Sequence, residues 1–304
     1  MIDMITQNLI CADGKSGEDP FNLKPIWDAV LAIYLEFAKV CEKHNLRYYL
    51  AYGNVLGAVR HGGFIPWDDD FDVMMPRLDY EKFLCVAPKE LPDYFKLVNW
   101  KNTPEFSTNL FTKIMDCRQE YLNELEIKVG KILNQGVFID IFPMDGIPRN
   151  GVSLAFLKLK RFFLDVITYP FLKSFRECSK VKQVCVWLVG RLAGVVCGIK
   201  NRADINRLWE KIISAESFDG SSKCGCVLSP YGFLKDVCDF EIFGKPIPLQ
   251  FSGMAIPSPA KPDKYLETIY GDYMSLPPVE KRKPSHLSQK IAPWRLGPTK
   301  NEAK

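Results

Sequence analysis

The feature that most constrains this chain is a run of aspartates that leads directly into an apolar segment. The run lies in "GFIPWDDDFDVMMPR", residues 63–77, and its members are Asp68, Asp69, Asp70 and Asp72. Neighbouring carboxylates repel one another, and burying them costs free energy unless a cation or hydrogen-bond donors compensate. A solvated turn after Pro66 would explain the first three, but it does not explain Asp72 inside "FDVMM". The chain is therefore expected to fold around this run.

Strand geometry gives the run a chemical meaning. If "DFDVMMP" is a strand, Asp70 and Asp72 point to the same face and can share a divalent cation. Mg²⁺ (or Mn²⁺) commonly uses one or two carboxylates together with substrate phosphates. Asp140 stands alone in the apolar run "VFIDIF", and a strand there beside the first would complete a three-carboxylate site. Asp140 could instead be a structural carboxylate at a helix N-terminus. The order of a calcium-binding EF-hand loop is absent.

Upstream, "YGN" stands between a predicted strand, "LRYYLAYG", and a predicted short helix, "NVLGAVRHG". Gly53 would let the backbone approach a ligand, and the helix N-terminus after it would favour phosphate, although Gly53 could also be an ordinary turn residue. A nucleotidyltransferase core has the same order of elements, namely a strand, a glycine turn, a helix, paired acids and a later strand with one acid. Each piece is weak alone, and the ordered set is more specific.

The succession of elements predicts a mixed α/β fold with a helical, basic insertion. Residues 1–24 are expected to be irregular. Residues 25–150 would form the catalytic core, 151–211 a basic amphipathic helical region, and 212–304 the part that completes the catalytic domain. A helix is expected over 25–44, ending near Asn45. Strands are expected in "YFKLVNW", "LFTKIMD" and "VCDFEIFGKPIPL", and in "GVFIDIFPMDGIP" up to Pro143.

Composition narrows the class of protein further. The 304 residues are 47% hydrophobic and 25% charged, which is typical of a globular protein and unlike a disordered chain, collagen or a coiled coil. The net charge of +4 does not argue for nucleic acid, and none is expected as a partner. Ten scattered cysteines without a secretory signal favour free thiols in a reducing cytoplasm. No apolar stretch reaches the length of a spanning helix, so the chain is expected to be soluble or to lie on a membrane.

The segment "YGNVLGAVRHGGFIPWDDDFDVMMPRLDYEKF", residues 52–83, resembles the signature of the LicD family of phosphocholine transferases, to which fukutin and the fukutin-related protein are related. "GVFIDIFPMDGIP" and "YGDYMSLPPVEKRK" also resemble LicD segments, so the likeness spans about residues 24–295. Asn54 departs from the Thr or Ser of many relatives, but it still donates and accepts hydrogen bonds. The resemblance implies a nucleotidyltransferase-like fold. It also implies an enzyme that moves a phospho-alcohol, by default phosphocholine, from a CDP-linked donor to a hydroxyl of a cell-surface glycan or its lipid-linked precursor.

By motif position, the resemblance implies that Asp70 and Asp72 are metal ligands and that Asp140 is a third ligand or the general base. Further residues are candidates for substrate binding, some of them as phosphate contacts. The substrate-binding set is Gly53, Asn54, Arg60, His61, Trp67, Arg77 and Lys113. A choline headgroup would need an aromatic cage. Trp67, Tyr48, Tyr52 and Trp100 are available, but aromatic residues at such spacings more often belong to the core.

Two interpretations of the basic helical region stay open. Residues 149–202 hold eleven Lys and Arg against two acids, next to many apolar residues. They could form an amphipathic surface that contacts anionic lipid and places the enzyme at the inner face of the cytoplasmic membrane, near a lipid-linked acceptor. They could equally be a helical subdomain with solvated basic faces. Two rivals to the transferase function also stay open, namely a true nucleotidyltransferase and a non-catalytic glycan- or nucleotide-binding module.

Overall fold

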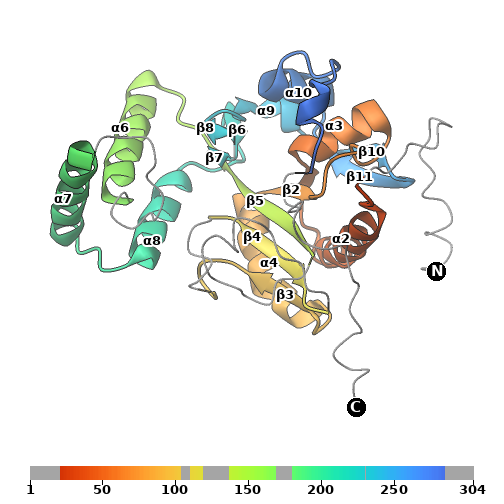
Figure 1. Cartoon of the computed structure of the whole chain (residues 1–304), viewed down its shortest axis with the longest axis horizontal. Helices are drawn as coiled ribbons and strands as arrows, with labels where there is room; N and C mark the ends of the chain where they lie inside the picture. The colour runs from red at the N-terminus through yellow and green to blue at the C-terminus, as the bar shows by residue number, and fades with distance from the viewer. Residues whose placement is uncertain (1–20, 104–109, 119–136, 169–179, 230, 285–304) are drawn as a thin grey trace.

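The computed structural model describes residues 21–103, 110–118, 137–168, 180–229 and 231–284 (Figure 1). Its centre is a mixed sheet in the order β1-β2-β5-β4-β3, with β6 and β9 attached at the end of β5. The strands of the main path are β1 (Tyr49–Leu50), β2 (Asp72–Pro76), β3 (Phe95–Val98), β4 (Thr112–Asp116) and β5 (Phe138–Gly146). Strands β2 and β5 run parallel, and the other pairs along this path are antiparallel. The predicted mixed α/β fold is confirmed.

Buried apolar residues explain why these segments form the centre. Every residue of β2, β4 and β5 is buried, as expected of strands covered on both faces. Helix α2 (Lys24–His44) presents a buried apolar stripe, contacts β4 and β5, and packs on α4 (Arg77–Glu90). The predicted end of α2 is confirmed, because Asn45 takes a left-handed conformation with φ 51° and caps the helix.

The link between β1 and α3 (Tyr52–His61) is a single residue, Ala51. The helix begins two residues before the predicted start, so Gly53 and Asn54 lie in its first turn rather than in a loop. This tight turn places Tyr52 in the left-handed backbone region, with φ 44°, which is strained for a residue other than glycine. The backbone N–H of Ala51 donates to the Asp72 carbonyl at 3.0 Å, which fixes the start of α3 against the acidic run.

Three predicted strands differ from those observed. Strand β2 begins at Asp72, so Asp70 lies just before the strand and not within it as predicted. Strand β5 does not end at Pro143 but continues to Gly146. Pro143 lies beyond the last residue pair with β4, so that side of the strand has no ladder for its missing N–H to interrupt. The predicted strand "VCDFEIFGKPIPL" is split, because α9 (Phe240–Phe243) separates β9 (Cys238–Asp239) from β10 (Ile247–Phe251).

The rest of the C-terminal part packs against α3. Strand β10 pairs with β11 (Met254–Ser258), and α10 (Pro262–Tyr270) contacts both α3 and α9. The remaining elements are β6 (Lys223–Gly225), the small hairpin of β7 (Leu228–Ser229) and β8 (Gly232–Phe233), and the 3₁₀ turn η3 (Val279–Lys281). Phe251 and Tyr265 join the same hydrophobic core as the sheet. Seven of the cysteines within the described ranges form no disulfide with one another.

The predicted helical region consists of α6 (Gly151–Thr168), α7 (Lys180–Val196) and α8 (Arg202–Ile213). Figure 1 shows these helices side by side at one end of the molecule, away from α2 and α3. They have a small hydrophobic core of their own, centred on Ile205 and Trp209 and continued by Leu164 and Ile167. Within the described ranges, no helix combines the length and the apolar character needed to cross a membrane.

Candidate active site

The two aspartates that the sequence places on separate strands lie side by side. Asp72 is the first residue of β2, and in the parallel ladder its partner is Asp140 on β5. Neighbouring strands lie about 4.8 Å apart, so the two carboxylates project from adjacent positions of one sheet. Both residues are nearly buried, with 9% of Asp72 and 7% of Asp140 exposed.

Lys113 supplies the positive charge beside this pair. It is the cross-strand partner of Asp140 in the antiparallel β4–β5 ladder. Its Nζ donates to Asp140 Oδ1 at 2.6 Å and to Oδ2 at 2.9 Å. The same ammonium lies 3.5 Å from the centre of the Phe138 ring, so an aromatic face and a carboxylate hold it in place. Lys113 was predicted as a phosphate contact, and in this structure its partner is Asp140.

The residues just before β2 are fixed by hydrogen bonds to their backbone. Asn54 is buried, and its Oδ1 accepts from the Asp72 N–H at 2.6 Å. Its Nδ2 group reaches the Asp70 carbonyl at 3.4 Å, and the Trp27 indole N–H donates to the Asp68 carbonyl at 2.8 Å. Asn54 was predicted to bind substrate, and in this structure its amide contacts the backbone of the acidic run.

Gly53 makes room for a neighbouring carboxylate. A Cβ atom at this position would lie 2.7 Å from Asp68 Oδ2, so a larger residue would displace that side chain. The close approach that glycine permits here is therefore an approach by the protein's own Asp68. The Asp68 side chain in turn lies close to that of Asp70, whose charge raises the pKa of Asp68. Sequence reasoning named Asp70 as a site residue but not Asp68.

The carboxyl groups raise one another's pKa. Burial raises the pKa of Asp72 well above its usual range, and the charges of Asp70 and Asp140 raise it further. Burial, followed by the charge of Asp70, acts in the same direction on the pKa of Asp68. The charge of Lys113 acts to lower the pKa of Asp72, but the pKa remains raised overall. Binding of a cation would therefore stabilise a cluster of this kind.

The donor set suits a hard divalent cation, because carboxylate oxygens are the ligands that Mg²⁺ and Mn²⁺ favour. In the part of the chain that the structure describes, however, no three His, Cys, Asp or Glu side chains are already arranged to hold one ion. Asp140 contacts Lys113 instead. The arrangement therefore fits an ion held by the Asp70–Asp72 pair and completed by substrate phosphates better than a preformed three-carboxylate cage.

Arg60, His61 and Trp67 gather at a second place, beside the C-terminal segment. Arg60 donates to the Tyr273 carbonyl at 2.8 Å and to His61 Nε2 at 3.0 Å, and the His61 ring lies edge-on to Trp67 at 6.2 Å. Burial lowers the pKa of Arg60, and the charge of Arg282 lowers it further. Arg282 also lies 5.6 Å from the Trp67 ring centre. Two guanidinium groups thus lie near Trp67, the residue that precedes the acidic run.

Arg77 lies apart from the acidic cluster. It begins α4, beyond the far end of β2, and makes a two-pronged ion pair with the buried Asp145 at 2.8 and 2.6 Å. Glu81 and Glu210 add further negative charge at 3.5 and 3.9 Å. The structure therefore gives Arg77 a position that joins α4 to β5 and α8. It does not bring Arg77 to the carboxylates expected to hold the metal.

Two of the aromatic residues considered for a headgroup cage, Tyr48 and Trp100, have other positions. The hydroxyl groups of Tyr48 and Tyr34 are 2.9 Å apart inside the core, and Trp100 is buried with Lys101 over its ring. Tyr52 packs near the acidic cluster, against Tyr231 and Phe142. Sequence reasoning did not name Tyr231, Tyr270 or Asp236 as site residues. Tyr270 begins the LicD-like segment "YGDYMSLPPVEKRK", whereas Tyr231 and Asp236 lie in no motif quoted above.

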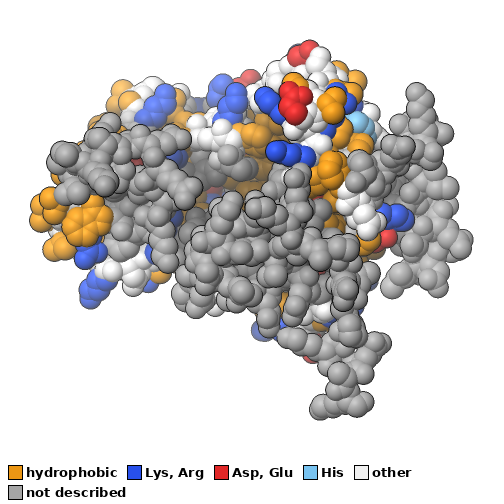
Figure 2. Space-filling model, viewed as in Figure 1, with side chains coloured by type: hydrophobic (Ala, Val, Ile, Leu, Met, Phe, Trp, Pro, Cys, Tyr) orange, Lys and Arg blue, Asp and Glu red, His pale blue; other side chains and the backbone are white. Residues whose placement is uncertain are grey.

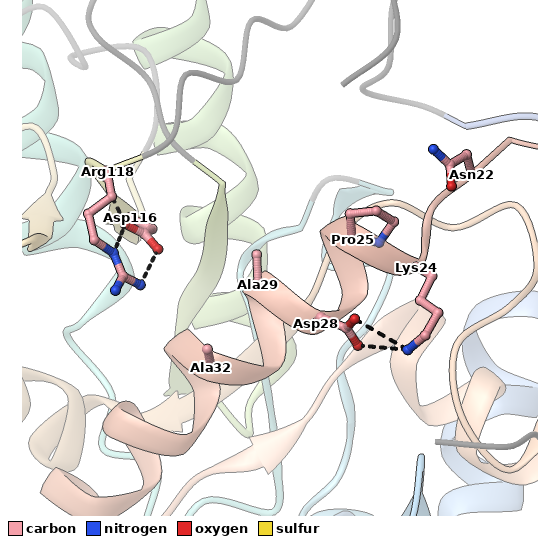
Figure 3. A pocket seen from close by; sticks show the side chains of 8 residues that line it. All are labelled: Asn22, Lys24, Pro25, Asp28, Ala29, Ala32, Asp116 and Arg118. Atoms are coloured by element: carbon pink, nitrogen blue, oxygen red, sulfur yellow. Dashed lines mark hydrogen bonds and ion pairs between the residues drawn. The ribbon is translucent and has the colours of Figure 1, made fainter. Parts of the chain in front are cut away.

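A groove of about 520 Å³ lies elsewhere, along α2 (Figure 3). Its charged side chains are paired within the groove, Lys24 with Asp28 at 3.2 Å and Arg118 with Asp116 at 2.7 Å. None of the aspartates of the acidic cluster lines it. The groove is therefore separate from the candidate active site.

Comparisons with known proteins agree with this geometry. The sequence model for the LicD/FKTN/FKRP nucleotidyltransferase domain matches residues 45–158, which include β1, α3, β2 and β5. The lipopolysaccharide cholinephosphotransferase LicD of Haemophilus influenzae is 30% identical over 262 residues, covering 83% of this chain and 91% of that protein. An uncharacterised protein of Rickettsia prowazekii is 28% identical over 131 residues, 43% of this chain and 40% of that protein.

The Haemophilus relative is aligned over nearly its whole length, and the domain match covers the strands that carry Asp72 and Asp140. The resemblance inferred from residues 52–83 is thereby confirmed. The chain belongs to the LicD family.

Proposed function

We propose that this protein is a metal-dependent transferase that moves phosphocholine from CDP-choline to a hydroxyl of a glycan. The observation that carries the proposal is the pairing of Asp72 with Asp140 on adjacent parallel strands, with Lys113 beside them. The name of the Haemophilus relative supports phosphocholine as the group transferred and a lipopolysaccharide-type glycan as the acceptor. Teichoic acid or a lipid-linked precursor would offer the same hydroxyl chemistry.

In the proposed reaction, the oxygen of the acceptor hydroxyl attacks the phosphorus that carries choline. The bond from that phosphorus to the CMP oxygen breaks, and CMP leaves with the bonding electrons. Asp140 accepts the proton of the hydroxyl, and Lys113 orients the carboxylate through its two hydrogen bonds. A bound Mg²⁺ or Mn²⁺, held by Asp70 and Asp72, would neutralise the diphosphate.

The guanidinium groups of Arg60 and Arg282 suit the diphosphate of the donor. They lie near Trp67, the residue that precedes the acidic run, and the charge of Arg282 disfavours that of Arg60 until an anion binds. His61, which accepts from Arg60, would orient that guanidinium. Asn54 acts by holding the backbone of Asp70 and Asp72, and Gly53 by leaving room for Asp68, rather than by touching substrate.

The first test is release of CMP. Purified protein with Mg²⁺ is incubated separately with CDP-choline, CDP-ribitol and CDP-glycerol, with slow hydrolysis by water reporting donor use. CMP from CDP-choline, suppressed by chelation, is expected. Asp72→Asn should lower the rate about 10³-fold, whereas Asp263→Asn, an exposed aspartate on α10, should not change it.

The outcomes separate the alternatives. CMP from CDP-ribitol or CDP-glycerol alone would keep the reaction class and overturn choline. Pyrophosphate from a nucleoside triphosphate, with the nucleotide attached to an acceptor, would identify a true nucleotidyltransferase. Magnesium-dependent donor binding without CMP release, even with glycan supplied, would identify a binding module.

We further infer that α6 and α7 lie on an anionic lipid surface. Most of the exposed large hydrophobic side chains in the described part belong to these helices, including Phe162 at 62%, Leu192 at 68% and Val196 at 86% exposure. Figure 2 shows an orange, hydrophobic area at the end of the molecule where α7 lies. Exposed basic residues lie among them, namely Lys158, Lys160, Arg191 and Lys200. Apolar side chains rimmed by cations match the charge of anionic headgroups.

Vesicle sedimentation tests this inference. Binding to vesicles of phosphatidylglycerol and phosphatidylcholine is expected, with weaker binding to phosphatidylcholine alone. Phe162→Ser with Val196→Ser should reduce binding more than tenfold, whereas Leu78→Ser, which removes an equally exposed side chain from α4, should not. If sedimentation velocity instead shows a dimer that the double variant dissociates, a second copy covers this face and the lipid inference is wrong.

A further inference from the structure

A continuous row of aromatic rings runs past the acidic cluster. Tyr270 of α10 meets Tyr231 at 5.5 Å between ring centres and an angle of 89°, and Tyr231 meets Tyr52 at 5.3 Å. Tyr52 meets Phe142 of β5 at 5.3 Å, and Phe142 meets Phe111 at 4.6 Å. These five rings, called the aromatic wall below, come from five separate parts of the chain. Their assembly is a property of the tertiary fold.

The wall lies on the side of the sheet where the carboxylates point. Phe142 is two positions after Asp140 on β5, and alternate residues of a strand share a face. By the same spacing, Phe111 stands two positions before Lys113, whose ammonium is 5.2 Å from the Phe111 ring. At the other end of the wall, partial burial raises the pKa of Tyr231, and the nearby charges of Asp72, Asp70 and Asp68 raise it further.

A buried carboxylate stands behind the wall. The Tyr52 hydroxyl donates to Asp236 Oδ2 at 2.6 Å, and Asp236 is fully buried. Its other oxygen, Oδ1, has no hydrogen-bond partner among the described residues, although the Ser229 hydroxyl is close enough to lower the pKa of the group. A buried carboxylate without full hydrogen bonding is costly unless a positive charge comes near.

The exposed part of the wall offers ring faces rather than hydrogen-bonding groups. Tyr231 is 48% exposed, yet its hydroxyl group is 2.8 Å from that of Tyr270, so the two hydroxyls satisfy each other. The rings of Tyr231 and Tyr270 meet at nearly a right angle and form a corner. A corner of ring faces with carboxylates behind and beside it suits a cation that cannot donate a hydrogen bond.

We propose that the aromatic wall binds the quaternary ammonium group of the donor, with Tyr231 as its main contact. The proposal rests on the proposed function, and it adds the residues that distinguish choline from other alcohols. A trimethylammonium group makes cation–π contacts with the ring faces and is attracted by the carboxylates. The hydroxyl groups of a polyol, by contrast, would lose water without gaining partners there. The wall thus acts in donor selection, and the paired aspartates act in transfer.

The test measures binding directly by calorimetry, with phosphocholine and phosphoethanolamine as probes. Wild-type protein is expected to bind phosphocholine at least tenfold more tightly. Tyr231→Phe keeps the ring face and should leave this preference within twofold. Tyr231→Leu keeps an apolar side chain without the π face and should abolish the preference. Tyr94→Ala is a matched control, because Tyr94 is 40% exposed and its ring is already covered by Arg118 at 3.9 Å.

Two results would overturn the proposal. Equal losses in the Phe and Leu variants would assign the role to the hydroxyl group. An unchanged preference in Tyr231→Leu would place the headgroup elsewhere. Circular dichroism verifies that the variants fold. Failure of wild-type protein to release CMP, together with phosphocholine binding that depends on Tyr231, would reject the proposed transfer and keep the wall. Release of CMP, together with a preference for phosphocholine that does not depend on Tyr231, would keep the proposed transfer and reject the wall.

Discussion

The sheet and the helical region break the usual rule of burial in opposite directions. In the sheet, charged residues are inside, with Asp72, Asp140 and Lys113 all less than 10% exposed. In α6 and α7, large apolar residues are outside, and Val196 reaches 86% exposure. Buried charges and exposed apolar side chains both cost free energy in an isolated chain. Each therefore marks a place where a bound partner would offset that cost. The expected partners differ, a cationic or phosphorylated ligand for the sheet and an apolar surface for the helices.

The largest stability effect is expected where a buried charge loses its partner. Lys113→Met removes the ammonium that contacts Asp140 and should lower the free energy of unfolding by about 3–5 kcal/mol, measured by guanidinium denaturation. Adding Asp140→Asn should recover much of this loss, since a neutral amide needs no counter-ion. Equal midpoints for Lys113→Met and wild type would mean that the pair is solvated in solution.

A second experiment asks whether the two regions unfold separately. Ile205→Ala on α8 and Ile139→Ala on β5 both truncate fully buried side chains, at an expected cost of about 2–4 kcal/mol each. Because Ile205 belongs to the small core of the helical region, its variant should speed amide exchange in α8 and leave β2 and β5 protected. Faster exchange throughout the chain in both variants would show one cooperative unit.

The buried Asp236 gives a pH-dependent prediction. Burial raises its pKa from 3.8 to about 7, so the folded protein holds a proton that the unfolded chain releases between about pH 4 and 7. Stability contributed by this group therefore falls as pH rises through that range. Asp236→Asn keeps an acceptor for Tyr52 and should stabilise the protein by about 2 kcal/mol at pH 8, with no gain at pH 4.

Thermal unfolding at the two pH values measures the Asp236 effect. Asp239→Asn is the matched control, because that side chain is 67% exposed and should give no pH-dependent difference. A gain from Asp236→Asn that is equal at pH 4 and pH 8 would contradict the assigned ionisation and indicate a packing effect.

The smallest effect is expected on the outer face of α7. Leu192→Ser with Val195→Ser should change the free energy of unfolding by no more than about 0.5 kcal/mol, since both side chains already face water. Urea denaturation without lipid measures it. A loss of several kcal/mol would mean that these residues are buried in solution, and the contrast between the two regions would disappear.

The sequence predicted what local periodicity encodes. Period-two spacing predicted the strands of Asp72 and Asp140, and their adjacency followed once the two strands paired in parallel. The Lys113–Asp140 contact could not be inferred in the same way, because it depends on the register of β4. Arg77 illustrates the limit, since its proximity in sequence to the acidic run says nothing of its distance across a strand.

The aromatic wall was beyond reach for a related reason. Tyr52 and Asp236 are 184 positions apart, and no spacing in the chain links them. The helical region was predicted as a unit. Its hydrophobic residues are spread around the helices, so the sequence alone left open which of them face outward. Only the packing of α8 against Leu164 and Ile167 separates the small core from the exposed face.

The parallel pairing of β2 with β5 also has a consequence for how the chain acquires activity. Asp72 and Asp140 are 68 positions apart, so no hairpin can bring them together, and a long intervening segment must be organised first. Until that closure, each carboxylate is hydrated and electrostatically independent of the other. The mutual repulsion that prepares the site for a cation thus arises only when the sheet closes. A chain interrupted before β5 would carry the whole acidic signature and still lack the chemistry.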